Sequence, residues 1–250
     1  AAPAAKAAPR TAWGTPDLQG VWSGATVTPL ERPAGQPEFL TPEDVASIEK
    51  AAYIRANDEA RGETQAADVT GAYNDFWWDR GTKVGAKRRS SLIFDPADGK
   101  LPPLATEMQK YASSPEAARR QATRRGEFPA ASWEDTDLWD RCLTRSLPIV
   151  PGPYNNNYQI FQTPTHVVIL HEMIHDARVI PISNAPHVGS DIRLWGGDAR
   201  AHWEGDSLVI ESTNFRNLQE YPFEPRTSAE KMRLVEKLTR TNEGTLLYEF

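Results

Sequence analysis

Hydrophobic and polar residues alternate along most of the C-terminal part of the chain, as they do in β-strands that bury one face. Turn sequences such as Glu204-Gly205-Asp206 and Asn242-Glu243-Gly244 separate the alternating runs. The pattern therefore predicts an antiparallel β-meander over residues 157–250. Its expected strands are 158–163, 167–172, 177–182, 192–195, 200–204, 207–214, 232–240 and 245–250.

The N-terminal half carries helical patterns and long loops instead. Thr41-Pro42-Glu43-Asp44 is typical of a helix start, because Thr can cap the helix, Pro fits its first turn and Asp can complete a capping box. This start predicts a helical segment over about 41–62. A second helical region is expected over about 104–145, with a break at Ser114-Pro115.

Together these elements predict a mainly β fold. We expect one β-rich domain over residues 17–250, in which the meander closes, or nearly closes, into a calycin-like barrel dressed by an N-terminal helical and loop-rich layer. The Ala/Pro-rich residues 1–16 are expected to be a disordered spacer. This spacer is typical of the segment that follows a removed signal peptide, so we expect a periplasmic or extracellular location.

Charge and composition exclude several classes of partner. A net charge of -6 argues against a nucleic-acid partner. No apolar run approaches the roughly 20 residues that a membrane span requires. The single cysteine, Cys142, excludes a zinc site built on paired cysteines.

All five histidines lie within residues 151–215, and two of them form a literal H-E-x-x-H sequence from His171 to His175. On a helix, both imidazoles would face one side and bind zinc, with Glu172 as the base. Neighbouring β-branched residues favour a strand, on which adjacent side chains point to opposite faces. We therefore expect no cofactor, and keep zinc bound by His171 and His175 as the alternative.

On a strand, Glu172, His175 and Arg178 would gather where the apolar pattern breaks. One interpretation is an acid/base site in which His175 is the base, Glu172 assists and Arg178 holds an anionic group. The other is an ion-pair network that only fixes the strand register. Residues expected to contact a ligand are Tyr154, Asn156, Tyr158, His187 and His202, although turn formation or surface exposure would also explain them.

Seven segments have a distinctive wording: DLQGVWSGATVTPLERP, FLTPEDVASIEKAA, YNDFWWDRGT, SSLIFDPADGKLPP, PYNNNYQI, VVILHEMIHDARVIPI and RAHWEGDSLVIESTNF. Together they resemble a widespread family of exported bacterial proteins to which no activity is assigned, and Gly20-Val21-Trp22 resembles the opening of lipocalins. The resemblance brings no catalytic residue to carry over. It implies variation at the position of His171, a chain that continues past residue 250, and a later cysteine that could pair with Cys142.

These observations predict an exported protein that binds a small or medium organic ligand in a β-barrel pocket. Metal-free acid/base catalysis, such as elimination, isomerisation or hydrolysis, would fit the expected polar cluster. An alternative is a non-enzymatic binding or assembly protein, structural or filament-like, that self-associates. A further alternative is a zinc hydrolase acting through His171-Glu172-His175.

Overall fold

The computed structural model describes residues 8–56, 64, 78–79, 81–136, 138–145, 147–216 and 231–250. The chain divides into two compact units, and the single β-rich domain over 17–250 stays a prediction. The first unit comprises Ala1–Trp22, Leu104–Val150 and Tyr158–Phe250, and the second comprises Ser23–Pro103 and Pro151–Asn157.

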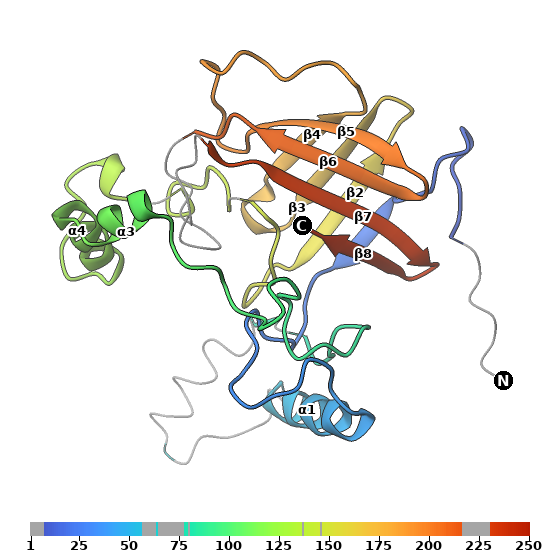
Figure 1. Cartoon of the computed structure of the whole chain (residues 1–250), viewed down its shortest axis with the longest axis horizontal. Coiled ribbons are helices and arrows are strands. Elements are labelled where there is room, and N and C mark those ends of the chain that lie inside the picture. Colours follow the sequence, from blue (N-terminus) through green and yellow to red (C-terminus); the bar gives the residue numbers. More distant parts are fainter. Residues whose placement is uncertain are drawn as a thin grey trace. The chain divides into compact units, whose positions relative to one another are not determined.

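Two antiparallel four-stranded sheets dominate the described chain, which confirms the prediction of a mainly β fold. Figure 1 shows the second sheet in front of the first, with the strands of the two sheets crossing at an angle. The first sheet has the order β1 (Gly20–Ser23), β2 (Asn157–Gln162), β3 (His166–His171), β4 (Ala177–Pro181). The second has the order β5 (Asp198–Glu204), β6 (Ser207–Thr213), β7 (Leu234–Asn242), β8 (Thr245–Glu249).

The core of the first unit follows directly from the alternation of the sequence. In β2 and β3, every second side chain is buried, as the burial of Ile160, Val167 and Ile169 shows. These residues pack in one cluster with Leu208 and Ile210 of the second sheet. The inner faces of both sheets therefore share one apolar core. The predicted strand at 192–195 is wrong, because this stretch forms a loop in which the β pairing is a single bridge between Leu194 and Phe215.

The two sheets are connected along one seam. Ile182, just after β4, forms a parallel bridge with Ala201 of β5, and Ser183 N–H donates to the Ala201 carbonyl oxygen at 2.9 Å. In the described chain, β1 and β8 are the outer strands of their sheets, and no ladder joins them. The calycin-like closure of the barrel accordingly stays a prediction.

The predicted helical regions are present. The helix α1 (Pro42–Arg55) starts with the expected capping box, in which Asp44 N–H donates to the Thr41 hydroxyl oxygen at 3.1 Å. The region 104–145 contains α3 (Thr106–Ala112), α4 (Pro115–Arg124) and the short 3₁₀ helix η1 (Trp133–Asp135). Residues 57–62 of the predicted first helix lie outside the described residues. None of the helices in the described part combines the length and the apolar composition that a membrane crossing requires.

Candidate functional site

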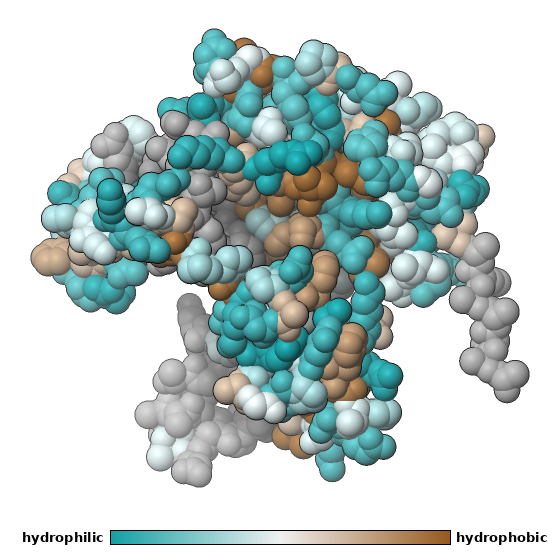
Figure 2. Space-filling model, in the orientation of Figure 1, coloured by the Kyte–Doolittle hydropathy of each residue, from teal (hydrophilic) through white to brown (hydrophobic). Residues whose placement is uncertain are grey.

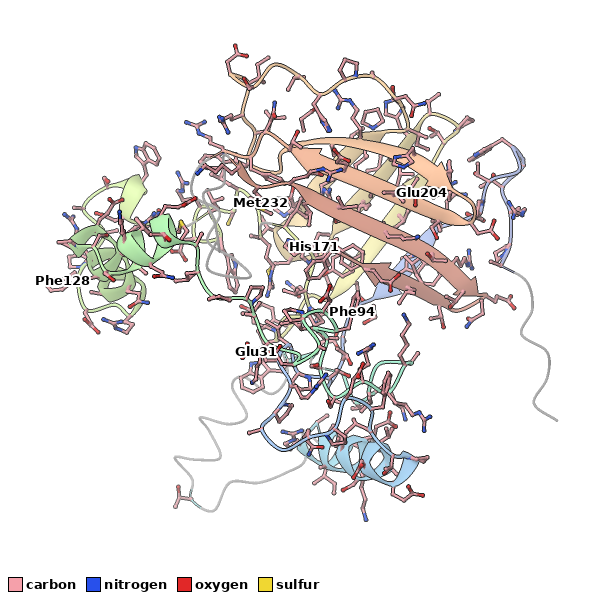
Figure 3. All side chains as sticks on the ribbon, viewed as in Figure 1. Glu31, Phe94, Phe128, His171, Glu204 and Met232 are labelled. Carbon is pink, nitrogen blue, oxygen red and sulfur yellow. The ribbon has the colours of Figure 1, made fainter. Side chains whose placement is uncertain are left out.

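The H-E-x-x-H sequence is a strand followed by a turn. His171 is the last residue of β3, opposite Tyr158 of β2, and the two rings stack with centroids 4.4 Å apart. His171 lies behind the second sheet in the view of Figure 3 and is half-buried, whereas Glu172 is exposed. The helix on which a zinc site at His171 and His175 depends is therefore not formed. Among the described residues, no group of three or more His, Cys, Asp or Glu side chains could hold a metal ion.

His175 lies in the tight turn η2 (Met173–His175) between β3 and β4. Ile174 and His175 both adopt left-handed backbone conformations, with φ of 66° and 51°. The His175 side chain is exposed and forms no hydrogen bond or ion pair within the described chain. No hydrogen bond or ion pair joins it to Glu172 or Arg178, so the expected acid/base cluster does not assemble there.

Arg178 instead points into the core, where it pairs with Glu236 of β7. Its Nη1 and Nη2 atoms donate to the two carboxylate oxygens at 3.0 and 2.7 Å, and Glu236 is fully buried. The Tyr248 hydroxyl donates to Glu236 Oε1 at 2.8 Å, and Ser212 Oγ lies 3.5 Å from Arg178 Nη2. An ion-pair network around Arg178 is what the structural interpretation of this residue predicts. The network links β4, β6, β7 and β8.

The electrostatics of this network keep Arg178 charged. Burial alone would lower the pKa of Arg178, but the adjacent Glu236 carboxylate outweighs that effect and raises it. Burial, reinforced by the Glu236 charge, also raises the pKa of Tyr248 well above its ordinary value. The phenol is therefore held neutral and acts as a hydrogen-bond donor to Glu236.

The predicted ligand residues near position 155 are divided between the two units. Asn156 belongs to the second unit and is buried. Its amide nitrogen donates to the carbonyl oxygens of Asp79 and Gly152 at 2.6 and 3.0 Å, and its amide oxygen accepts from Gly152 N–H at 2.7 Å. These bonds make Asn156 a turn-forming residue, as the structural interpretation predicts. Tyr154 is half-buried in the same unit, whereas Tyr158 is buried in the core of the first.

His187 and His202 are the predicted site residues that lie among further titratable groups. His187 Nδ1 is 2.8 Å from Asp198 Oδ2, and its Nε2 faces Glu211 Oε1 at 3.9 Å. Asp198 Oδ2 also accepts from Val188 N–H at 3.2 Å, and Asp198 Oδ1 accepts from Arg200 at 2.7 Å. Because Asp198 holds Nδ1, Nε2 is the ring nitrogen that can accept a proton from a ligand.

The carboxylates around His187 are stabilised in their charged forms. Burial alone would raise the pKa of Asp198, but hydrogen bonds from His187, Val188 N–H and Arg200 outweigh it and lower that pKa. A hydrogen bond from Arg233, at 2.6 Å, lowers the pKa of Glu211. The His187 imidazole therefore faces two carboxylates that remain ionised at neutral pH.

A glycine before β5 and an asparagine after β6 hold the His187 loop near Asp198. Gly197 precedes β5 with φ of 70°, and a Cβ atom there would lie 2.7 Å from the Thr213 carbonyl oxygen. Asn214, just after β6, donates its side-chain amide to the carbonyl oxygens of Val188 and Gly189 at 3.0 Å each. These contacts fix the loop that carries His187 against the end of the second sheet.

The outer face of the second sheet continues this polar site. His202 and Glu204 follow on β5, with His202 Nε2 3.3 Å from Glu204 Oε1, and Figure 3 shows Glu204 at the end of that strand. Figure 2 shows hydrophilic side chains over most of this face and a hydrophobic area over β6 and β7. Val235, which is 40% exposed, is the register partner of Glu211 there.

A hollow in the second unit contains none of the predicted site residues. Its volume is about 60 Å³, and it is lined mostly by apolar side chains, with Thr28, Gln36, Arg89 and Ser90 as the polar lining residues. Arg89 is already paired with Glu38 at 2.7 Å. The hollow is therefore a mostly apolar surface whose one charged lining residue, Arg89, is already paired.

The sequence did not predict the residues that surround His187 and Arg178. These are Asp198 and Glu211 near His187, and Glu236 and Tyr248 in the network of Arg178. Glu236 had a readable signal, because it lies at an inward position between Leu234 and Leu238, where a charged residue needs a buried partner. Asp198 and Glu211 had none, since only the fold brings them to His187. No family model, curated protein or solved structure matches the chain, so its resemblance to the exported family stays a prediction.

Proposed function

We propose that the protein binds a small or medium organic ligand at the outer face of the second sheet and performs metal-free acid/base chemistry on it, with His187 as the base. One observation carries the proposal: the 2.8 Å contact between His187 Nδ1 and the nearly buried Asp198 carboxylate. Pairs of this kind fix the tautomer of an imidazole and leave the lone pair of Nε2 directed away from the carboxylate that holds Nδ1, here Asp198.

The chemistry of the pair follows from its charges. Neutral His187, with its Nδ1 proton donated to Asp198, removes a proton from the ligand or from a water molecule through Nε2. The imidazolium that forms lies between two ionised carboxylates, Asp198 and Glu211, which stabilise its positive charge. The same imidazolium then returns the proton, which is the sequence required for elimination, isomerisation or hydrolysis.

The surroundings of His187 suit an organic ligand. Val235 offers an exposed apolar contact beside Glu211, and Arg233 and His202 add polar groups on the same face. Ligand sites typically combine an apolar surface with a few convergent polar groups. His175 lacks such surroundings, because it stands on an exposed turn without a carboxylate partner in the described chain.

Two broader expectations belong to the same proposal. Closure of the two sheets into a calycin-like barrel is supported by the bridge between Ile182 and Ala201 along one seam. Export to the periplasm or the extracellular space is the second expectation, and the Ala/Pro-rich residues 1–16 support it as a spacer of the kind that follows a removed signal peptide.

The proposal is tested with 4-nitrophenyl acetate as a probe for general-base hydrolysis. His187→Ala should lower the initial rate by about 100-fold, the lower end of what a positioned general base contributes. His175→Ala is the matched control, because it removes an exposed imidazole that has no carboxylate partner in the described chain. Circular dichroism would establish that both variants are folded. A folded His187→Ala variant with the wild-type rate, or an equal loss in His175→Ala, would overturn the assignment.

A second candidate, a binding or assembly protein without chemistry, is favoured by the outer face of the first sheet. Phe161, Val168 and Val179 lie in one row across β2, β3 and β4. Phe161 is 44% exposed and Val179 is 64% exposed. An exposed apolar row of this kind is typical of an interaction surface. Assembly predicts a molecular mass in light scattering that rises with concentration and falls to the monomer value in Val179→Lys.

A further inference from the structure

Trp195 is the centre of a cluster in which aromatic rings and guanidinium groups alternate. The Cζ atoms of Arg216 and Arg141 lie 4.7 and 5.6 Å from the centroid of its ring. Arg141 also lies over Trp133, 5.0 Å from that centroid. The cluster joins the loop before β5, the segment after β6 and the region around η1, all within the first unit.

Two arginines of this region have no acidic partner among the described residues. Within the described chain, the Arg216 guanidinium stacks on Trp195 and forms no hydrogen bond or ion pair, and Arg193 donates through Nη1 to the Phe215 carbonyl oxygen at 3.3 Å. That carbonyl belongs to the residue before Arg216, and Arg216 N–H donates to the carbonyl oxygen of Leu194, the residue after Arg193, at 2.8 Å, so the two arginines lie on adjoining backbone segments. Elsewhere in this unit, Arg178, Arg200 and Arg233 all pair with carboxylates. Among the described residues, two arginines without an acidic partner therefore lie together at this point.

Stacking on tryptophan prepares a guanidinium for binding an anion. A stacked guanidinium is held in place by its flat face, while the N–H groups at its edge stay available for a carboxylate. A carboxylate accepts two such N–H groups at once, which fixes its orientation. Arg216 is held in this manner by Trp195.

Apolar surface lies next to the charges. Ile192 and Leu194, on the loop that carries Trp195, are 50% and 48% exposed, and Trp133 is 59% exposed. A purely ionic ligand would gain nothing from these side chains. A ligand with a flat ring would cover them and gain the free energy of apolar burial.

We propose that this cluster binds an organic anion that carries a carboxylate on a flat aromatic ring. Arg216, supported by Arg193, takes the carboxylate, and the ring lies against the exposed apolar side chains beside Trp195. The site is separate in its residues from the His187 site and does not depend on the proposed function.

The test uses 2-naphthoate as the probe in isothermal titration calorimetry. Arg216→Gln should weaken binding about tenfold or more, because it removes a charge-assisted bidentate contact. Arg216→Lys should also weaken binding, since an ammonium keeps the charge but loses the planar fork. The neutral 2-naphthalenemethanol should bind far more weakly than 2-naphthoate.

The matched control is Arg89→Gln in the second unit. Arg89 also stacks on aromatic rings, at 4.8 Å from Phe39 and 5.5 Å from Phe94, but Glu38 already neutralises it. This variant should bind 2-naphthoate as the wild type does, and so should His187→Ala, which separates this test from that of the proposed function. Unchanged affinity in Arg216→Gln, or equal binding of the neutral alcohol, would refute the site.

Discussion

Two hydrogen-bonded pairs of nearly equal length have different surroundings in the first unit. Arg178 and Glu236 approach to 2.7 Å between the sheets, and His187 and Asp198 approach to 2.8 Å at the outer face of the second sheet. In the inner pair, both carboxylate oxygens and the guanidinium are occupied by protein groups. In the outer pair, one imidazole nitrogen remains turned away from its partner, and the side chain is 25% exposed.

The difference shows that burial, rather than distance, decides what a charged pair can do. A saturated pair in the core ties strands together and has no group left for a ligand. A carboxylate that orients an accessible imidazole leaves one nitrogen for proton transfer. Arg178, the residue expected to clamp an anion, therefore has a structural role, whereas His187 has the environment expected of a base.

The largest effect is expected from breaking the inner pair on one side. Glu236→Gln leaves the Arg178 charge buried without a carboxylate, so the free energy of unfolding should fall by about 3–5 kcal/mol. Urea denaturation followed by tryptophan fluorescence would measure this loss.

The double variant Arg178→Met/Glu236→Leu is the control for that experiment. It removes both charges together, so its stability should lie close to that of the wild type or above it, as with other buried pairs replaced by apolar residues. A loss below about 1 kcal/mol in Glu236→Gln would mean that water reaches Arg178 and that the pair is not a core element.

Local sequence patterns were enough to predict most of the strands. Strands β2, β3, β6 and β7 were predictable because alternation and hairpin turns are local signals. The strand at His171 was predictable for the same reason, since β-branched neighbours disfavour a helix. The loop at 192–195 was mistaken for a strand because its Ile and Leu resemble a strand's buried face but are exposed.

The site was less predictable than the fold, because its partners come from distant strands. Arg178 and Glu236 are 58 residues apart, and the sequence placed Arg178 with its neighbours Glu172 and His175 instead. His187 was among the expected ligand residues, but no local sequence pattern connected it to Asp198 and Glu211. Closeness in sequence was a poor guide here, since a tight turn directed His175 into solvent while the next strand directed Arg178 into the core.

An intermediate effect, dependent on pH, is expected from the outer pair. Asp198→Asn removes a charged acceptor of several hydrogen bonds and should cost about 1–2 kcal/mol at pH 7. The folded state lowers the pKa of Asp198, so this stabilisation is present above the unfolded value of about 3.9 and is lost as pH falls through the folded value. The stability difference between wild type and variant should therefore shrink below about pH 4.

Asp206→Asn is the matched control for this measurement. Asp206 lies on the β5–β6 hairpin with a side chain that is 66% exposed, and it pairs with Arg10, which is itself 53% exposed. Its replacement should change stability little at any pH. A difference for Asp198→Asn that stays constant from pH 7 to pH 2 would contradict the assigned pKa shift.

The smallest change in stability is expected for the pair of Arg233 and Glu211, although its contact is shorter than those of Arg178 with Glu236 and His187 with Asp198. Arg233 and Glu211 approach to 2.6 Å on the outer face, but their side chains are 63% and 32% exposed. Water and salt screen such a pair, so Arg233→Gln should leave the urea midpoint unchanged within error. Added sodium chloride at 0.5 M, roughly enough to reduce the Debye length to a few ångströms, should not alter that result. A loss as large as that of Glu236→Gln would show that contact distance, and not burial, determines the strength of ion pairs in this protein.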